Sequence, residues 1–113
     1  MNLTYAYIFL VVAIMMEVLG TSFLKDTNGF TKFYPSLFCV VVFCVCLYLM
    51  SHVMKVIPVG ITYATWSGLG IVAVSIIAVI KYKQVPNIPT MIGLFLIVCG
   101  VVIVNLMNDI EVK

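Results

Sequence analysis

Charged residues divide this chain into four long apolar segments. Apart from Glu17, formally charged side chains occur only within positions 25–32, at 55, within 81–83 and within 109–113. The intervals 33–54, 56–80 and 84–108 carry no formal charge, and the segment before position 25 is interrupted only by Glu17. About 20 helical residues cross a hydrocarbon core of roughly 30 Å, so each segment is long enough to span a membrane.

This pattern predicts four helices, at about residues 4–24, 34–54, 58–80 and 89–107, which form a single transmembrane domain over residues 1–113. Helices are favoured over barrel strands because the apolar runs are continuous, whereas a barrel strand alternates lipid-facing and lumen-facing residues. Turn residues at positions 26–29 and prolines at the predicted helix starts separate the elements. A cleavable signal peptide is not expected, because the first span lacks a basic leading region and a small-residue cleavage site.

Composition supports the same class. Hydrophobic residues make up 65% of the chain and charged residues 9%, against about 25% charged residues in soluble domains. We therefore expect an all-α membrane protein that contacts lipids and has no nucleic-acid partner. The sequence contains no nucleotide-binding loop, nucleophile–base pair or metal-binding spacing, so we expect neither an enzyme nor a cofactor or metal. The cysteines are expected to serve as small apolar packing residues: Cys39, Cys44, Cys46 and Cys99.

Glu17 is the ionisable side chain predicted to lie deep inside a span. Insertion of a carboxylate near mid-bilayer costs about 2.5–3.5 kcal/mol, so such a group is usually kept for a proton, a cation or a ligand. The alternative is a protonated or hydrogen-bonded glutamate that joins helices, for which Asn105 is the amide available in the other spans. Helical spacing places mostly apolar or small residues on the same side as Glu17: Leu10, Ala13, Ile14, Gly20 and Thr21.

The third span carries a polar and aromatic face. Tyr63, Trp66, Ser67 and Gly70 are spaced i, i+3, i+4 and i+7, which places them on one side of a helix. A carboxylate opposite two aromatic rings suits an organic cation, because cation–π attraction contributes about 2 kcal/mol or more when the pair is desolvated. The alternative is interfacial anchoring, which suits tyrosines near the span ends better than Trp66.

Glycines predict where helices bend or meet. Gly68 and Gly70 predict a kink or a flexible point in the third span. Four short helices are too few to enclose a polar pathway, so we expect a dimer. In the fourth span one stripe of residues suits pairing across a subunit boundary, although glycine is also simply frequent in membrane helices. The stripe consists of Gly93, Ile97, Gly100 and Val104.

Several motifs resemble the small multidrug resistance family of bacterial transporters. The matching segments follow in order over nearly the whole chain: 16–25, 29–32, 34–36, 58–70 and 93–106. The most specific blocks are Glu-Val-x-Gly-Thr, beginning at Glu17, and Tyr-Ala-x-Trp-Ser-Gly-x-Gly, beginning at Tyr63.

The resemblance implies an antiparallel homodimer of four-helix subunits in the bacterial inner membrane, with the paired Glu17 side chains at the bottom of a chamber. Protons and a cationic substrate would compete for Glu17, and Tyr63 and Trp66 would contact the substrate. It further implies chamber-lining roles in the first span for the five residues around Glu17 named above, a third-span kink at its two glycines, and dimer contact through the two glycines of the fourth span. Ser67 and Phe43 complete the expected substrate site; many relatives have tyrosine where Phe43 stands.

The expected activity is therefore proton-coupled export of lipophilic or quaternary ammonium cations. Gly20-Thr21-Ser22 after the glutamate and Asn105-Leu106 in the last span resemble the quaternary-ammonium and multidrug branch. The guanidinium-exporting branch tends to have a tryptophan soon after its glutamate and a lysine near the end of its last helix. Two alternatives stay open: export of guanidinium or another small cation, and a non-transporting partner subunit of a heteromeric complex.

Overall fold

The computed structural model describes residues 2–109 and consists of four long helices. They are α1 (Leu3–Leu24), α2 (Phe33–Val53), α3 (Val59–Tyr82) and α4 (Ile88–Met107), with a short 3-10 turn, η1 (Lys25–Thr27), after α1. Each long helix is apolar enough to cross a membrane. The predicted all-α membrane fold is confirmed, with helix bounds that differ from the predicted ones by one or two residues.

Local capping explains where the outer helices begin. The Asn2 side chain accepts a hydrogen bond from the Tyr5 backbone N–H at 2.9 Å, and the Asn87 side chain accepts one from the Thr90 N–H at 3.0 Å. Each asparagine thereby satisfies an N–H group that has no partner within its helix. Proline near the start of α4 adds a residue without such an N–H group.

The α1–α2 connection reverses the chain through three successive residues with positive φ. These are Asn28 (47°), Gly29 (71°) and Phe30 (63°). Glycine adopts this conformation without steric cost, whereas Phe30 does not. The buried Thr27 hydroxyl holds the turn, because it donates to the Leu24 carbonyl at 2.7 Å and accepts from the Phe30 N–H at 3.1 Å.

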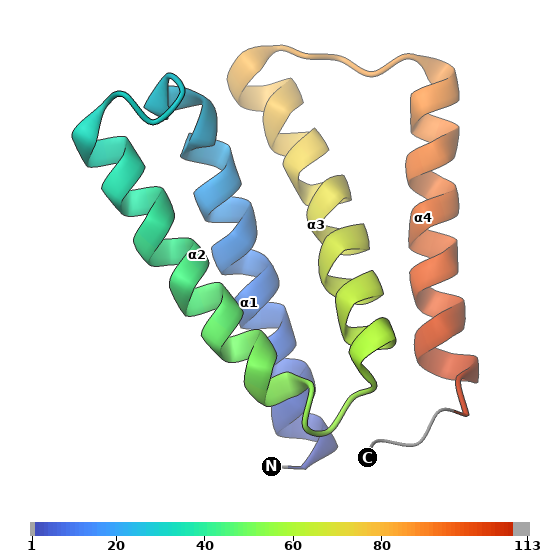
Figure 1. Ribbon diagram of the computed structural model, residues 1–113. Helices are drawn as coiled ribbons and strands as arrows, with labels where there is room; N and C mark the ends of the chain where they lie inside the picture. Colours follow the sequence, from blue (N-terminus) through green and yellow to red (C-terminus); the bar gives the residue numbers. More distant parts are fainter. Residues whose placement is uncertain (1, 110–113) are drawn as a thin grey trace.

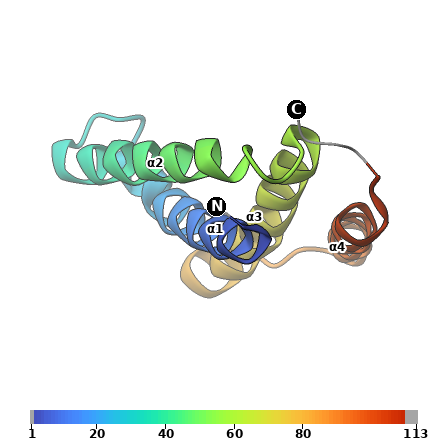
Figure 2. The ribbon, with the colours of Figure 1, turned by 90° about the horizontal axis from the view of Figure 1, so that it is seen from below.

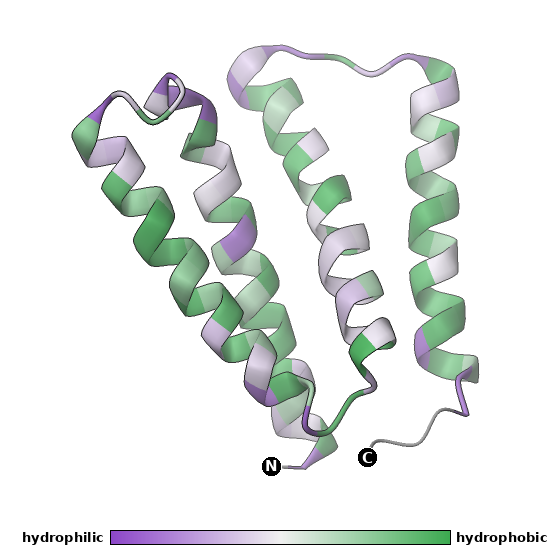
Figure 3. Cartoon of the chain, in the orientation of Figure 1, coloured by the Kyte–Doolittle hydropathy of each residue, from purple (hydrophilic) through white to green (hydrophobic). Residues whose placement is uncertain are grey.

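Helix α1 packs against α2 and α3, whereas α4 packs on α3 at the edge of the bundle (Figures 1 and 2). The start of α1, the end of α4 and the α2–α3 connection lie at one end, and the α1–α2 and α3–α4 connections lie at the other (Figure 1). Figure 3 shows hydrophilic residues gathered at these two ends and mostly hydrophobic helices between them. The core lies among α1, α2 and the start of α3, around buried side chains: Ala6, Leu10, Ala13, Cys46, Met50, Val53, Ile57 and Ile61.

Small residues and thiols bring α1 and α2 together. A methyl group placed on Gly20 would lie 3.2 Å from both the Phe43 ring and Val42. The Cys39 thiol donates to the Gly20 carbonyl at 3.4 Å, and the Cys46 thiol donates to the Ala13 carbonyl at 3.2 Å. These two cysteines are therefore buried packing residues that also make hydrogen bonds.

The other two cysteines differ from the packing prediction. Cys44 is exposed and Cys99 is only partly buried, and all four cysteines are free thiols. For Cys44, helical spacing explains the difference. Cys39 and Cys46 are seven residues apart and share one face of α2, whereas Cys44 lies on a different face.

A polar network joins α4 to the rest of the bundle. The Asn105 amide donates to the Thr65 hydroxyl at 2.7 Å and to the Val101 carbonyl at 2.8 Å. Its side-chain oxygen accepts from the Tyr7 hydroxyl at 2.9 Å. Asn105 of α4 therefore bonds to Tyr7 of α1 and Thr65 of α3, and Tyr7 links two helices although it lies near the end of its span.

The stripe predicted for dimer contact is divided in the structure of one subunit. A side chain added at Gly93 or Gly100 would meet no atom within 4 Å. Ile97, by contrast, contacts Gly68, and Val104 packs against the core. The two glycines therefore leave a part of α4 uncovered, while the branched residues already serve packing within the subunit.

We predict that Gly68→Ala destabilises the packing of α4 on α3. A methyl group at Gly68 would lie 2.6 Å from Val101 Cγ2 and 3.2 Å from Ile97 Cγ2, and β-branched side chains have little rotamer freedom to move aside. Overpacking of this kind costs about 1–3 kcal/mol. The check is unfolding of the detergent-solubilised protein by sodium dodecyl sulfate, followed by circular dichroism.

Gly60→Ala is the matched control, because a side chain at Gly60 meets nothing within 4 Å. The control should unfold at the same denaturant fraction as the parent or at a higher one. Equal destabilisation by the two substitutions would show that glycine matters in α3 for a reason other than the close approach of α4.

Candidate functional site

The Glu17 carboxylate faces α3 from the middle of α1. One oxygen, Oε1, accepts a hydrogen bond from the Thr21 hydroxyl one turn later, at 3.0 Å. The other, Oε2, is buried and has no hydrogen-bond partner among the described residues. It fits there because Gly70 has no side chain: a methyl group on Gly70 would lie 2.8 Å from Oε2. The two oxygens thus differ in environment, and only Oε1 is satisfied by the protein.

A cavity of about 330 Å³ opens beside this carboxylate, between α1 and α3. Its lining consists of Glu17, Thr21, Tyr63, Trp66, Ser67, Gly70, Ile71, Val74 and Ser75. None of these described lining residues is basic, so Glu17 supplies the formal charge of the site. A carboxylate with an unpartnered oxygen in such a cavity is costly unless a proton or a cation joins it.

Two aromatic rings form one wall of the cavity. The Tyr63 and Trp66 ring centroids are 5.6 Å apart, with an interplanar angle of 69°. Tyr63 is 58% exposed, whereas the indole Nε1 of Trp66 is buried without a hydrogen-bond partner among the described residues. The α3 helix positions these rings one turn apart on the cavity wall, where a ring face can attract a bound cation.

The wall hydroxyls of α3 bond to their own helix. Ser67 Oγ donates to the Tyr63 carbonyl at 2.7 Å, and Ser75 Oγ donates to the Ile71 carbonyl at 2.8 Å. Their protons are therefore engaged, and the hydroxyl oxygens retain only acceptor capacity. This arrangement adds to the preference of the cavity for positive charge.

Five of the residues expected in the substrate site line this cavity, and five lie elsewhere in the subunit. The five in the cavity are Glu17, Thr21, Tyr63, Trp66 and Ser67. Leu10 and Ala13 are buried in the core, and Gly20 packs under Phe43 at the contact of α1 with α2. Leu10 and Ile14 border a second, apolar cavity of about 310 Å³ near α4. Helical spacing predicted that these α1 residues lie on the same side as Glu17. It could not distinguish the residues that face α2 or α4 from those that face α3.

The cavity also contains residues that sequence reasoning missed. Ile71, Val74 and Ser75 extend the wall of α3 beyond Gly70. Their spacing continues the stripe that begins at Tyr63 and Ser67, so extension of the helical pattern by one further turn would have found them.

The two glycines in the middle of α3 are points of close approach. Gly68 contacts α4 and Gly70 contacts the Glu17 carboxylate. The helix is continuous through both residues, so the kink predicted from their position stays a prediction.

The fold and the cavity define a multi-pass helical membrane protein with an anionic, aromatic-lined site. The family model described as Small Multidrug Resistance protein matches residues 5–97. The chain belongs to this family, and the resemblance seen in its motifs is confirmed.

Similar proteins cover nearly the same length. The chain is 44% identical over 100 residues to the quaternary ammonium compound-resistance protein QacC of Staphylococcus aureus, with 88% of this chain and 94% of that protein covered. It is 40% identical over 102 residues to the multidrug transporter EmrE of Escherichia coli (strain K12), with 90% and 93% covered. The protein is therefore a multidrug-resistance transporter of the bacterial inner membrane, not an enzyme.

Proposed function

We propose that this protein exports lipophilic and quaternary ammonium cations in exchange for protons, and that both ligands compete for Glu17. The observation that carries the proposal is the unpartnered Oε2 of Glu17, buried beside a cavity of about 330 Å³ that Tyr63 and Trp66 line. A proton neutralises this oxygen directly, and a cation in the cavity neutralises it by ion pairing. Because one negative charge accepts either ligand, binding of one weakens binding of the other.

The Thr21 hydroxyl gives the carboxylate a fixed orientation. Its hydrogen bond occupies Oε1, while Oε2 has no hydrogen-bond partner among the described residues and is left for a proton or a cation.

The substrate class follows from the wall of the cavity and from the named functions of the relatives. Aromatic rings beside a carboxylate bind weakly hydrated organic cations, because such cations lose little hydration free energy on entry. The quaternary ammonium compound-resistance proteins to which the chain is similar support the same class. Guanidinium is the second candidate, since it is also an organic cation that can bind a carboxylate.

Proteoliposome assays decide between these substrates. When a proton gradient is applied, the purified protein should transport tetraphenylphosphonium in the direction opposite to proton flow. It should also release protons on binding this cation, with little response to guanidinium. The opposite preference would indicate that the protein exports guanidinium or another small cation. Absence of both activities from the purified chain would favour a partner subunit that needs a second protein.

We infer that the working unit is an antiparallel homodimer. In one subunit α4 packs mainly along α3, and side chains added at Gly93 and Gly100 would meet no atom within 4 Å. A second α4 can approach closely at these glycines. A second copy would also place another Glu17 beside the first and enclose a cavity that one subunit leaves incomplete.

An antiparallel homodimer requires that the same chain inserts in both orientations. The α1–α2 and α3–α4 connections and the adjoining helix ends carry four lysines, and the order of the spans in the sequence assigns Lys55 and Lys113 to the opposite side. The four are Lys25, Lys32, Lys81 and Lys83. A difference of two lysines leans toward the cytoplasm for the first group, but it is a small bias under the positive-inside rule. Lys113 lies outside the described residues.

We predict that a tag fused to the C-terminus is found on both sides of the membrane. One lysine added to the α2–α3 connection, near Lys55, should shift the distribution measurably, because it halves the difference in lysine count. Cysteine labelling from either side in intact cells and inverted vesicles provides the measurement. A single orientation for every copy would contradict the homodimer and indicate an oppositely inserted partner chain.

A further inference from the structure

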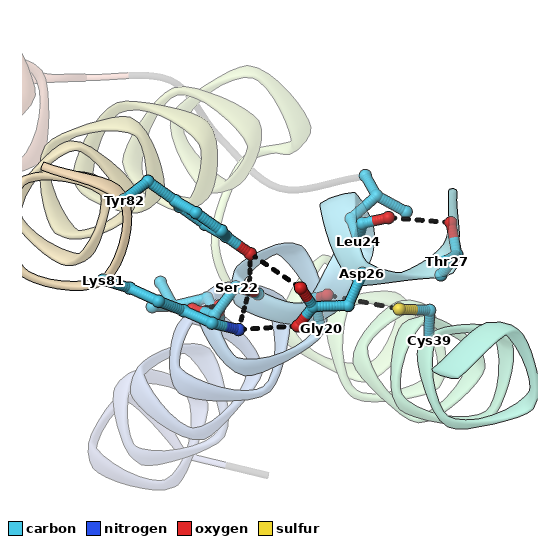
Figure 4. A network of polar contacts seen from close by, with 9 residues as sticks. Gly20, Ser22, Leu24, Asp26, Thr27, Cys39, Lys81 and Tyr82 are labelled. Carbon is cyan, nitrogen blue, oxygen red and sulfur yellow. Dashed lines mark hydrogen bonds and ion pairs between the residues drawn. The ribbon is translucent and has the colours of Figure 1, made fainter. Parts of the chain in front are cut away.

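The ends of α1 and α3 are joined by a polar cluster at the end of the bundle that carries the α1–α2 and α3–α4 connections (Figure 4). Lys81 Nζ lies 2.7 Å from Asp26 Oδ2 and donates to the Ser22 carbonyl at 2.9 Å. The Tyr82 hydroxyl donates to the same carbonyl at 3.0 Å and lies 3.4 Å from Asp26 Oδ1. We refer to Ser22, Asp26, Lys81 and Tyr82 as the end latch.

The end latch uses backbone groups that the end of a helix leaves available. Ser22 lies in the last turn of α1, where carbonyls lack partners within the helix and the helix dipole favours a cation. Lys81 supplies that cation, and its ammonium group also lies 4.0 Å from the centroid of the Phe23 ring. The two residues of α3 thus hold both the backbone and the carboxylate at the end of α1.

The latch joins the same two helices that wall the Glu17 cavity, and Ser22 itself borders a neighbouring cavity between α1 and α3. On α1 the Glu17 cavity reaches Thr21, which precedes Ser22. On α3 it reaches Ser75, which is less than two helical turns before Lys81. The contacts of the latch therefore hold together the two helices that form the walls of the cavity, at the end of the bundle that carries the α1–α2 and α3–α4 connections.

The strength of the latch suits a contact that opens and closes. The Lys81 and Asp26 side chains are 33% and 40% exposed, so water and salt reach the ion pair. Exposed pairs contribute little net stability, whereas the surrounding hydrogen bonds fix the geometry when the pair is formed. Separation of α1 from α3 at this end would return both charges to water at small cost.

We propose that Lys81 and Asp26 gate the Glu17 cavity at this end of the bundle. In the conformation described here the pair is formed and holds α1 and α3 together at this end; separation of the pair lets the two helices part and widens access to the cavity from that side of the membrane. These are positioning residues that act through the spacing of α1 and α3. The assignment of cations as the molecules that pass the gate rests on the proposed function, but the gate itself is defined by the helix contacts.

Accessibility of the cavity wall tests the gate without any transport measurement. In a Ser75→Cys background, the rate of labelling by a charged, water-soluble maleimide is measured on the purified protein in detergent. Lys81→Met and Asp26→Asn should each raise this rate by about two- to five-fold, the range that loss of an exposed ion pair allows. Labelling of the four native cysteines is subtracted by use of the same variants without Ser75→Cys.

Lys83→Met is the matched control. It removes the same charge from the same end of the bundle, but Lys83 is exposed and is not part of the end latch. Its labelling rate should equal that of the Ser75→Cys parent. High salt should raise the rate in the parent and leave Lys81→Met nearly unchanged, because salt screens an exposed ion pair.

The combination of variants provides the decisive comparison. The double variant Lys81→Met/Asp26→Asn should label no faster than either single variant, and the exchanged pair Asp26→Lys/Lys81→Asp should return the rate toward that of the parent. Equal rates for Lys81→Met and the parent, or an equal increase from Lys83→Met, would overturn the gate. Loss of cation transport with the labelling pattern intact would instead overturn the proposed function and leave the gate in place.

Discussion

Glu17→Gln is expected to abolish both cation binding and the proton release that cation binding causes. The substitution keeps the size of the side chain. It also keeps an oxygen that can accept from the Thr21 hydroxyl, which in the parent lies 3.0 Å from Glu17 Oε1. It removes the negative charge that Oε2 offers to a proton or a cation. Loss of one partner from a desolvated charge pair costs about 2–5 kcal/mol, so affinity should fall by more than roughly thirty-fold.

The pH dependence of binding provides the second part of this test. In the parent, cation affinity should rise by about ten-fold per pH unit over the pH range in which one proton is displaced for each cation bound. In Glu17→Gln the residual affinity should not change with pH. Glu17→Asp should retain some binding and shift the pH at which it changes, because the carboxylate moves about one methylene away from the cavity.

Tetraphenylphosphonium binding by calorimetry, with proton release followed in weakly buffered solution, gives both quantities. The proton release is the direct measure of competition at Glu17. Release from Glu17→Gln at the level of the parent would show that another group carries the proton.

Trp66→Ala is expected to give the second largest loss, about ten- to thirty-fold in affinity for large aromatic cations. The indole forms part of the cavity wall beside Tyr63, at 5.6 Å between ring centroids. Removal of the ring eliminates its cation–π attraction, which contributes about 2 kcal/mol when desolvated. Trp66→Phe should keep part of the affinity, because a smaller ring stays in place.

The control for this prediction is an aromatic residue outside the cavity. Tyr5 is 58% exposed, the same fraction as Tyr63, and lies near the start of α1. Tyr5→Ala should leave affinity and dimer yield nearly unchanged. Tyr82→Ala is not a suitable control, because the Tyr82 hydroxyl bonds to Ser22 and Asp26. Equal losses from Trp66→Ala and Tyr5→Ala would indicate a general folding role for the aromatic residues.

The residues of α1 around Glu17 show the limit of helical periodicity. Their spacing placed them correctly on the carboxylate side of one helix. In the structure, however, Ala13 and Gly20 face α2, Leu10 belongs to the core, and Thr21 alone of the five lines the cavity with Glu17. A helix with neighbours on two sides divides even a narrow stripe between them, and periodicity contains no information about where those neighbours lie.

The sequence by itself determined the four membrane helices, the carboxylate and its aromatic partners. The helices follow from local physics, because in an apolar medium each helix satisfies its own backbone hydrogen bonds and must be long enough to cross it. Glu17 could be identified in the same way, since a carboxylate within such a span is costly wherever its neighbours lie.

Only the tertiary structure decided which contacts those helices make. The room for Glu17 Oε2 comes from Gly70, 53 positions further along the chain. Asn105 bonds to Thr65 and Tyr7, and Lys81 bonds to Asp26, 55 positions away. These pairings depend on the packing direction and axial offset of α1, α3 and α4. Many hydrophobic residues of similar size contribute to that packing, so no single local pattern specifies it. Local sequence patterns therefore predict the helices, while the contacts between distant residues appear only after the helices pack.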